Sequence, residues 1–394
     1  MTAPEGAALR RIVIVGYGVA GLTAGDALRD AGFDGELIIV GEEPHVPYSR
    51  PALSKAVLAD AAGTPDLSVL ELPEPAHGAT EMLGRRAVGL RAQQRVLELD
   101  DGTALDYDGL VIATGSRPRR FTDSPLEISL RTQPEALQLR ERLVDRPSVI
   151  VLGGGPLGME VASSARAMGC EVTVVNRGTP MVQQMGSYLG ELCARAAAER
   201  GVEIIDDLAV DVGPAAETDD EASCLAVTLG SGVVLRAQLV ISAIGDQLND
   251  DWLQDSGLLR DGRLIIDERG RVAPGVVAAG DIAWRQTPEG LRRMPLWMHA
   301  IDQAKSAAQG LLLGDEADPF VPRPYFWTEQ FGLHVRVAGP VVQGDPIVVD
   351  GDAESRRMLV RWGGAEGLGT AASVNYRIPI PRLRRLAASA PAAL

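Results

Sequence analysis

The sequence predicts an α/β protein with two similar doubly wound units and a small C-terminal α+β domain. The first observation is a short β-branched run that leads into a glycine-rich turn at residues 11–21. The second is the recurrence of this pattern at residues 148–158. The third is a change after the proline-rich stretch 318–325, where strand-like runs replace the helical pattern.

The first unit is predicted from three consecutive segments. RIVIV at 11–15 is short, apolar and β-branched, which is typical of a buried strand. Residues 19–31 carry apolar side chains at helical spacing, and ELIIV at 36–40 predicts a second strand. A strand, a glycine-rich turn, a helix and a strand in this order form the βαβ unit of a doubly wound sheet.

The second unit repeats that order. It has a strand at 148–152, a turn at 153–158, a helix at 156–168 and a strand at 171–175. Pro156 suits the first turn of the helix.

The remaining segments connect and complete the two units. The other expected elements are strands around a DDG turn at 84–114, a helix at 133–144, strands at 239–245 and 275–283, and a helix at 299–313 that ends at Gly314. The expected domains are a first one from 1–118 with 245–322, a second from 119–244 and a third from 323–394.

Composition narrows the class of protein. The net charge of -15 argues against a general nucleic-acid binder. No apolar run reaches the roughly 20 residues that span a bilayer, and the polar start MTAPEGAALRR lacks a secretory pattern, so a cytoplasmic protein is expected. Cys170, Cys193 and Cys224 lie far apart, which predicts neither a redox-active pair nor a metal site.

The glycine-rich turn of the first unit is typical of dinucleotide binding. Gly16 permits a tight turn, Gly18 lets a pyrophosphate approach the backbone, and Gly21 lets the helix pack on the strand. The helix N-terminus then faces the phosphates with its partial positive charge. Glu42, at the end of the second strand, can accept hydrogen bonds from ribose hydroxyls.

The second unit carries the same kind of turn at Gly153, Gly155 and Gly158. Two Rossmann-like dinucleotide-binding domains in one chain suggest two dinucleotides. A bound flavin and a diffusible nicotinamide cofactor are the economical pair. Asp281 follows Gly280 at the end of an apolar strand, where a carboxylate is costly unless it binds a hydroxyl or another donor. A ligand hydroxyl could be that donor. The alternative is that Asp281 is a helix N-cap.

Eight segments, in order along nearly the whole chain, resemble the FAD-dependent pyridine nucleotide-disulfide oxidoreductases, specifically the ferredoxin/rubredoxin reductase branch. They are VGYGVAGLTAGDALRDAG, VGEEPHVPYSRPALSKAVL, LDYDGLVIATGSRPR, SLRT, VIVLGGGPLGMEVASSARAMGCEVTVV, GVVAAGDIA, AIDQAKSAAQGLLLG and YFWTEQFGLHVRVAG. The absent cysteine pair separates the chain from the disulfide reductases.

The resemblance implies roles for particular residues. Those implied to hold FAD are Gly16, Gly18, Ala20, Gly21, Glu42, Arg50, Lys55, Val88, Ala113, Thr114, Gly115, Arg131, Gly280, Asp281 and Trp297, with Trp327 as a further candidate beside the flavin ring. Those implied to hold NAD(P)H are Gly153, Gly155, Gly158, Glu160, Asn176 and Arg177.

The same resemblance implies that Lys55 and Glu160 form an ion pair by the reactive edge of the flavin, as catalytic residues that fix the nicotinamide pose. Dipole compensation at a helix start is the alternative for Glu160. Trp297 could instead be a core residue, because Pro295 and Leu296 precede it where the family often has Glu-His. His299 could be a helix-start residue or carry a proton.

The end of the second nucleotide strand differs from that of NADH-using relatives, which carry Glu there. Asn176 repels neither NADH nor NADPH, and Arg177 could attract a 2′-phosphate. The residues therefore favour NADPH and leave NADH open.

The expected activity is an FAD-dependent NAD(P)H:ferredoxin reductase that serves a monooxygenase or dioxygenase, as a monomer or homodimer. An acidic ferredoxin would need a basic patch, for which 117–120, 291–293 and 381–386 are candidates. An NAD(P)H oxidase or biosynthetic oxidoreductase, and a redox-responsive interaction protein, are the alternatives.

Overall fold

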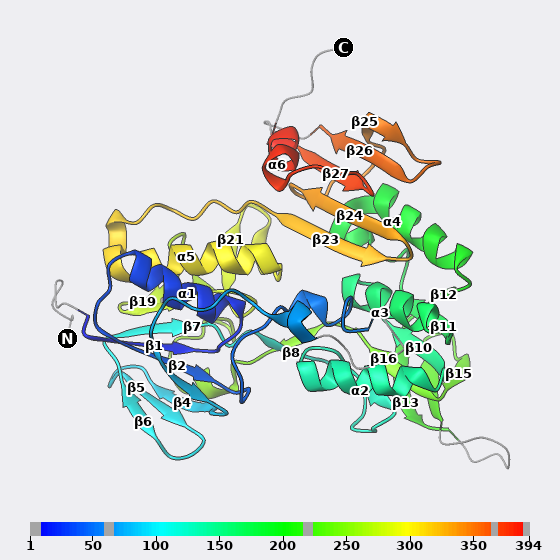
Figure 1. Cartoon of the computed structure of the whole chain (residues 1–394). Helices are drawn as coiled ribbons and strands as arrows, with labels where there is room; N and C mark the ends of the chain where they lie inside the picture. Colours follow the sequence, from blue (N-terminus) through cyan, green and yellow to red (C-terminus); the bar gives the residue numbers. More distant parts are fainter. Residues whose placement is uncertain (1–8, 59–66, 216–223, 364–368, 389–394) are drawn as a thin grey trace. The chain divides into compact units, whose positions relative to one another are not determined.

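The computed structural model describes residues 9–58, 67–215, 224–363 and 369–388 (Figure 1). Residues 1–8, on which the expectation of a cytoplasmic protein partly rests, lie outside this set. The chain divides into two compact units. Unit 1 contains Met1–Ser49, Glu71–Arg117 and Gln247–Arg323, and unit 2 contains Arg50–Leu70, Pro118–Asp246 and Pro324–Leu394.

Unit 1 is built on a six-stranded sheet in the order β19-β20-β7-β1-β2-β3. All neighbours are parallel except β19, which runs antiparallel to β20. Its strands are β1 (Arg11–Val15), β2 (Glu36–Gly41), β3 (Thr80–Leu83), β7 (Gly109–Ile112), β19 (Arg271–Ala273) and β20 (Val276–Ala278). The predicted first strand has these bounds, and the strand expected at 275–283 is shorter because the chain turns at Gly280 with φ +81°.

Both faces of this sheet are covered, which explains why its strands are apolar at successive positions. Ile12 and Ile14 face α1 (Val19–Asp30) and α5 (Trp297–Leu313), which lie side by side in Figure 1. Val13 and Val15 face a small antiparallel sheet of β4 (Ala87–Arg91), β5 (Val96–Leu99) and β6 (Ala104–Asp106). The strands predicted around the DDG turn are therefore present.

The rest of unit 1 consists of short elements on either side of α5 along the chain. Its elements are β18 (Ile265–Ile266), β21 (Trp284–Thr287), β22 (Gly290–Arg292) and the short 3-10 helices η3 (Asp251–Leu253) and η4 (Gly314–Glu316). The strands β8 (Ser116–Pro118) and β17 (Asp246–Leu248) each cross a boundary between the units.

Unit 2 contains a parallel sheet in the order β12-β11-β10-β16-β9. Its strands are β9 (Glu127–Ile128), β10 (Ser148–Leu152), β11 (Glu171–Asn176), β12 (Glu203–Asp206) and β16 (Leu239–Ser242). The antiparallel sheet of β13 (Ala209–Pro214), β14 (Leu225–Leu229) and β15 (Val234–Ala237) shares a core with β10 and β16.

Three helices accompany this sheet: α2 (Gln133–Val144), α3 (Pro156–Ala167) and α4 (Val182–Glu199). Helix α2 has the predicted bounds, and a capping box of Thr132 and Glu135 fixes its start. Helix α4 was not predicted. It contains Gly186 at φ +81°, and this non-helical residue interrupts the periodic pattern that would reveal a helix.

The C-terminal part of unit 2 is a five-stranded antiparallel sheet in the order β23-β24-β27-β26-β25, with α6 packed on it. Its elements are β23 (Tyr325–Gln330), β24 (Leu333–Ala338), β25 (Ile347–Asp352), β26 (Arg357–Trp362), β27 (Thr370–Val374) and α6 (Ile380–Ala388). Two 3-10 helices, η1 (Arg50–Ala52) and η2 (Leu67–Leu70), complete the unit. The fold is thus mixed α/β with parallel and antiparallel sheets.

Two absences hold for the residues that the structure describes. None of their helices combines the length and apolar character that crossing a membrane requires. No group of three or more of their His, Cys, Asp and Glu residues could hold a metal ion.

Burial raises the pKa of the Cys170 thiol, and that of Cys193 to about 12, so both are inert packing residues at neutral pH.

Candidate active site

The glycine turn of unit 1 is closed on one side and open on the other. Gly16 has φ +102°, and a Cβ there would lie 2.3 Å from the carbonyl oxygen of Ala113. A Cβ on Gly21 would lie 1.9 Å from the carbonyl oxygen of Gly16. A Cβ on Gly18, the N-cap residue of α1, would meet no described atom within 4 Å. The helix N-terminus therefore faces open space, which fits a phosphate group.

The turn of unit 2 has the same construction. Gly153 has φ +100°, and its Cβ would lie 2.3 Å from the carbonyl oxygen of Ala243. A Cβ on Gly158 would lie 1.9 Å from the carbonyl oxygen of Gly153, and one on Gly155 would meet no described atom within 4 Å. The two turns therefore have one geometry, and each leaves open space at the N-terminus of a helix, which fits a phosphate group.

Other predicted residues of unit 1 lie beside its turn. Gly280 approaches helix α1, because a Cβ on Gly280 would lie 3.1 Å from the Cβ of Ala20. The Gly280 amide donates to Gln303 Oε1 at 2.8 Å, which fixes the turn that carries half-buried Asp281. Thr114 Oγ1 donates to the carbonyl oxygen of Asn249 at 2.8 Å. The segments after β1, β7 and β20 thus meet at one edge of the sheet.

The remaining predicted residues of unit 1 are more exposed. Glu42 follows β2 with an exposed side chain, and Val88 on β4 is 49% exposed. Trp297 is half-buried and is the first residue of α5. Helix α5 therefore begins two residues before the predicted start, and His299 lies inside its first turn.

His299 is buried, and its ring contacts that of Phe320 with 5.3 Å between centroids. Burial lowers the pKa of His299 to about 4; Arg285 lowers it further and Asp281 opposes the shift. The imidazole is therefore neutral at pH 7. This state disfavours a role in which His299 donates a proton near neutrality.

Lys55 and Glu160 form the ion pair that the resemblance implied, with 2.7 Å between Lys55 Nζ and Glu160 Oε2. Both belong to unit 2, and their side chains are 15% and 4% exposed. Lys55 Nζ also donates to the carbonyl oxygen of Pro51 at 3.1 Å. These two bonds use two of the three ammonium protons.

Two hydroxyls that the sequence did not single out also bind this carboxylate. Ser54 Oγ donates to Glu160 Oε2 at 2.5 Å, and Thr328 Oγ1 donates to Glu160 Oε1 at 2.7 Å. Ser54 precedes Lys55 and Thr328 lies within the segment YFWTEQFG, but nothing in the sequence pairs them with Glu160. In the same unit, Arg50 donates to the carbonyl oxygen of Arg131 at 2.6 Å. Trp327, which precedes Thr328, is half-buried, with its ring centroid 6.1 Å from that of Tyr325.

The side chain of Asn176 is bonded to the backbone. Asn176 Oδ1 accepts from the Gly154 amide at 2.8 Å, and Nδ2 donates to the carbonyl oxygen of Gly178 at 2.9 Å. Arg177 is exposed, and no hydrogen bond or ion pair joins its side chain to another described residue. Asp206, the register neighbour of Asn176 on β12, accepts from the Gly178 amide at 2.7 Å. A carboxylate therefore lies beside the end of β11, although it belongs to the adjacent strand β12.

Buried Tyr17 and His77 form a hydrogen-bonded network at the first glycine turn. Tyr17, between Gly16 and Gly18, is hydrogen-bonded to His77 Nε2 at 3.0 Å and donates to Glu81. The Ala79 amide donates to His77 Nδ1 at 3.1 Å, so Nδ1 carries no proton and Nε2 does. Burial lowers the pKa of His77 and raises that of Tyr17, which keeps both groups neutral.

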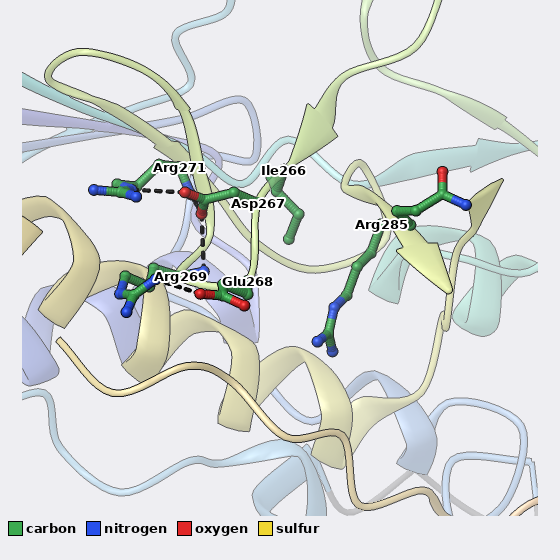
Figure 2. A pocket seen from close by; sticks show the side chains of 7 residues that line it. Ile266, Asp267, Glu268, Arg269, Arg271 and Arg285 are labelled. Carbon is green, nitrogen blue, oxygen red and sulfur yellow. Dashed lines mark hydrogen bonds and ion pairs between the residues drawn. The ribbon is translucent and has the colours of Figure 1, made fainter. Parts of the chain in front are cut away.

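Unit 1 also has a surface depression of about 390 Å³, which is lined by residues outside the candidate site (Figure 2). Arg271 is paired there with Asp267 at 2.7 Å, and Arg269 with Glu268 at 2.5 Å. Arg285, on β21, also lines it (Figure 2). None of the predicted site residues lines this depression, so we do not assign the candidate site to it.

Comparison with known proteins gives consistent matches. The family model described as pyridine nucleotide-disulphide oxidoreductase matches residues 10–304. Rhodocoxin reductase of Rhodococcus erythropolis is 35% identical over 357 residues, which cover 87% of this chain and 81% of that protein. The benzene 1,2-dioxygenase system ferredoxin–NAD(+) reductase subunit of Pseudomonas putida is 32% identical, over 84% of this chain and 80% of that protein.

Solved structures agree. Putidaredoxin reductase in its covalent complex with putidaredoxin is similar with a TM-score of 0.82 and 27% identity, covering 96% of this chain and 92% of that chain. The ferredoxin reductase for the CYP199A2 system from Rhodopseudomonas palustris has a TM-score of 0.82 and 29% identity, covering 93% and 91%. The water-forming NADH oxidase from Lactobacillus brevis, at 17% identity with a TM-score of 0.79 over 96% of this chain and 89% of that chain, shares the fold alone.

Proposed function

The chain belongs to the pyridine nucleotide-disulphide oxidoreductase family, and from this membership we propose that it is an FAD-dependent NAD(P)H:ferredoxin reductase. It passes electrons from a nicotinamide cofactor to a small iron–sulfur protein that serves an oxygenase. The observation that carries the proposal is the pair of glycine turns with one geometry, because this activity needs two dinucleotides. The relatives named as ferredoxin reductases support the identity of the acceptor.

The family supports FAD and a nicotinamide cofactor. When bound, the flavin couples the two-electron chemistry of nicotinamide to the one-electron chemistry of an iron–sulfur cluster. The protein contributes binding and orientation, so no side chain needs to act as an acid or base. The raised pKa values of buried Cys170 and Cys193 agree with the absence of a thiol step.

We assign FAD to the first turn and NAD(P)H to the second, with domains at 1–118 with 245–322 for FAD, 119–244 for NAD(P)H and 323–394 as the C-terminal domain. The open space at Gly18 and at Gly155 supports both assignments, since backbone amides at a helix start bind phosphate. The residues assigned to FAD are Gly16, Gly18, Ala20, Gly21, Glu42, Arg50, Lys55, Val88, Ala113, Thr114, Gly115, Arg131, Gly280, Asp281 and Trp297. Those assigned to NAD(P)H are Gly153, Gly155, Gly158, Glu160, Asn176 and Arg177.

The Lys55–Glu160 pair orients the reacting rings in this proposal. The third ammonium proton of Lys55 remains after its bonds to Glu160 and Pro51, and it is the one that a cofactor can accept. Glu160 lies on α3, the helix that the second turn opens. The pair thus joins the nicotinamide-binding helix to the segment that carries Lys55.

NADH is the better candidate for the electron donor, which reverses the preference drawn from Asn176 and Arg177. The name of the Pseudomonas putida relative specifies NAD(+). The amide of Asn176 is already bonded to backbone groups, and Arg177 is exposed. The Asp206 carboxylate, held against the loop after β11, would repel a 2′-phosphate.

The acidic partner would dock on exposed arginines. The segment 117–120 is a weak candidate because Arg117 is paired with Asp251 at 2.9 Å and Arg119 donates to the carbonyl oxygen of Asp246. The exposed side chains of Arg292 in the segment 291–293, and of Arg382 and Arg385 on α6, are the better candidates. Charged residues of this kind steer the encounter more than they strengthen the complex.

The deciding experiment is steady-state turnover of the FAD-loaded protein with NADH or NADPH against a panel of ferredoxins and O2. Reduction of a ferredoxin well above the rate of O2 consumption is the expected result. Fast O2 turnover without a protein acceptor would favour the oxidase. Slow turnover with every acceptor, together with a mass change on adding NADH, would favour the redox-responsive interaction protein. A colourless protein that takes up no FAD would refute all three.

A further inference from the structure

The carboxylate of Glu160 is nearly enclosed by three donors from two separate segments. Its side chain is 4% exposed. Lys55 and Ser54 donate to Oε2, and Thr328 donates to Oε1. A carboxylate that accepts bonds on both oxygens has one preferred orientation.

A fourth residue sets the direction of the Thr328 bond. Gln330 Nε2 donates to Thr328 Oγ1 at 3.0 Å. The hydroxyl has one proton, so an oxygen that accepts from Gln330 directs that proton to Glu160 Oε1. Gln330 thereby orients the Thr328 hydroxyl towards the Glu160 carboxylate.

The strand that carries Thr328 and Gln330 is attached to the helix that carries Glu160. The amide of Phe331, directly after β23, donates to Ser163 Oγ at 2.7 Å. Ser163 lies three residues after Glu160 on α3, which is about one helical turn. Thr328 and Gln330 are 0% and 3% exposed. This arrangement leaves the Thr328 hydroxyl little freedom to turn elsewhere.

We propose that Thr328, oriented by Gln330, is a positioning residue that holds the Glu160 carboxylate towards Lys55. The C-terminal sheet, expected from the sequence only as part of a small α+β domain, then shapes the reaction site. The role in hydride transfer rests on the proposed function, whereas the coupling of Thr328 to Glu160 does not.

The first test measures the coupling itself, without cofactor. Melting temperatures of the full chain are compared for wild type, Thr328→Val, Glu160→Met, which has no acceptor oxygen, and the double variant. Thr328→Val should lower the melting temperature by roughly 3 °C, and by much less when Glu160→Met is already present. Equal shifts in both backgrounds would overturn the proposal. This cycle can be read even if the protein binds no FAD.

The second test uses the FAD-loaded protein in rapid mixing with NADH. Thr328→Val should lower the limiting rate of flavin reduction roughly tenfold with little change in the apparent Kd for NADH. Thr328→Ser, which keeps the hydroxyl, should restore most of the rate. In a Lys55→Met background, Thr328→Val should have no further effect, because the pair that it positions is gone.

Ser373→Ala is the matched control. Ser373 lies on β27 of the same sheet, is 1% exposed, and its hydroxyl makes no hydrogen bond with a described residue. Its loss removes a buried hydroxyl that does not contact the pair, so the limiting rate should stay as in wild type. A fall equal to that of Thr328→Val, or failure of Thr328→Ser to restore the rate, would show that Thr328 acts only through packing.

Discussion

At the scale of single residues, the role proposed for Lys55 depends on the groups that its ammonium contacts. The chain has only two lysines, Lys55 and Lys305, and otherwise uses arginine as its cation. An ammonium is compact and has three donors, whereas a guanidinium is planar and cannot offer the same geometry. The bonds of Lys55 Nζ to Glu160 and to the carbonyl oxygen of Pro51 explain why a lysine stands here.

Lys55→Met should slow flavin reduction by NADH about ten- to hundredfold, because the bond that orients the reactants is lost. Rapid mixing of the FAD-loaded variant checks this. Removal of the cation also leaves the Glu160 carboxylate buried without its charge partner, which destabilises the protein. The double variant Lys55→Met, Glu160→Gln should recover the melting temperature but not the rate.

Lys305→Met provides the control, since Lys305 is exposed on α5. It removes the same charge and should leave the rate unchanged. An unaltered rate in Lys55→Met would contradict the proposed role of the pair.

Asp206→Asn should raise kcat/KM for NADPH relative to NADH roughly three- to tenfold, because it removes a negative charge near the position assigned to the 2′-phosphate. The ratio of kcat/KM values and the binding of 2′,5′-ADP both report it. Glu203→Gln removes an equal charge about 10 Å away on the same strand, and should not change the ratio. Equal ratios in both variants would remove Asp206 from the determinants of specificity.

At the scale of elements, the glycines of the two turns fall into two groups, one required for packing and one facing the space assigned to a ligand. Gly16 and Gly21 face backbone atoms at distances that leave no room for a methyl group. Gly18 and Gly155 have φ values of -88° and -75°, which any residue can adopt, and their Cβ positions are open. Alanine at these two positions should therefore fold and occupy the space assigned to phosphate.

Gly18→Ala should weaken FAD retention at least roughly tenfold with little change in the stability of the FAD-free protein or in NADH affinity. Gly155→Ala should do the reverse and weaken NADH binding while FAD is retained. Fluorescence of released FAD and titration with NADH check the two outcomes. If each variant lost both ligands, the assignment of one dinucleotide to each turn would be wrong.

At the scale of the whole molecule, two buried histidines make stability depend on pH. The folded state lowers the pKa of His299 to about 4, and it also lowers that of His77, mainly through burial. Arg285 and Asp281 act on His299, and Asp26, Glu81 and Arg29 act on His77. The unfolded chain binds these protons more readily than the folded chain does. The contribution of the two histidines to the free energy of unfolding is therefore complete above about pH 6.5 and falls as the pH drops towards 4.

His299→Gln removes one of these titrations. The loss of unfolding free energy between pH 7 and pH 4.5 should be smaller than in wild type by up to about 3 kcal/mol. Denaturant unfolding across this pH range measures it. Parallel wild-type and variant curves would show that His299 does not contribute.

Local patterns were sufficient for much of the fold. The strand at 11–15, the helix at 133–144 and the strand at 148–152 have the predicted bounds, because each is apolar or capped by its own sequence. Helix α4 was missed because Gly186 and Gly190 interrupt its pattern. The start of α5 was placed two residues late, since no capping side chain marks it among the described residues.

The sequence by itself determined the two glycine turns and the family, because these depend on short motifs in a fixed order. The pairing of Lys55 with Glu160 was implied by the resemblance to that family. Only the tertiary structure brought Ser54 and Thr328 to Glu160, and Asp206 to the end of β11. The physical reason is that hydrogen bonds between distant segments depend on how strands align and helices pack, and no local pattern records that alignment.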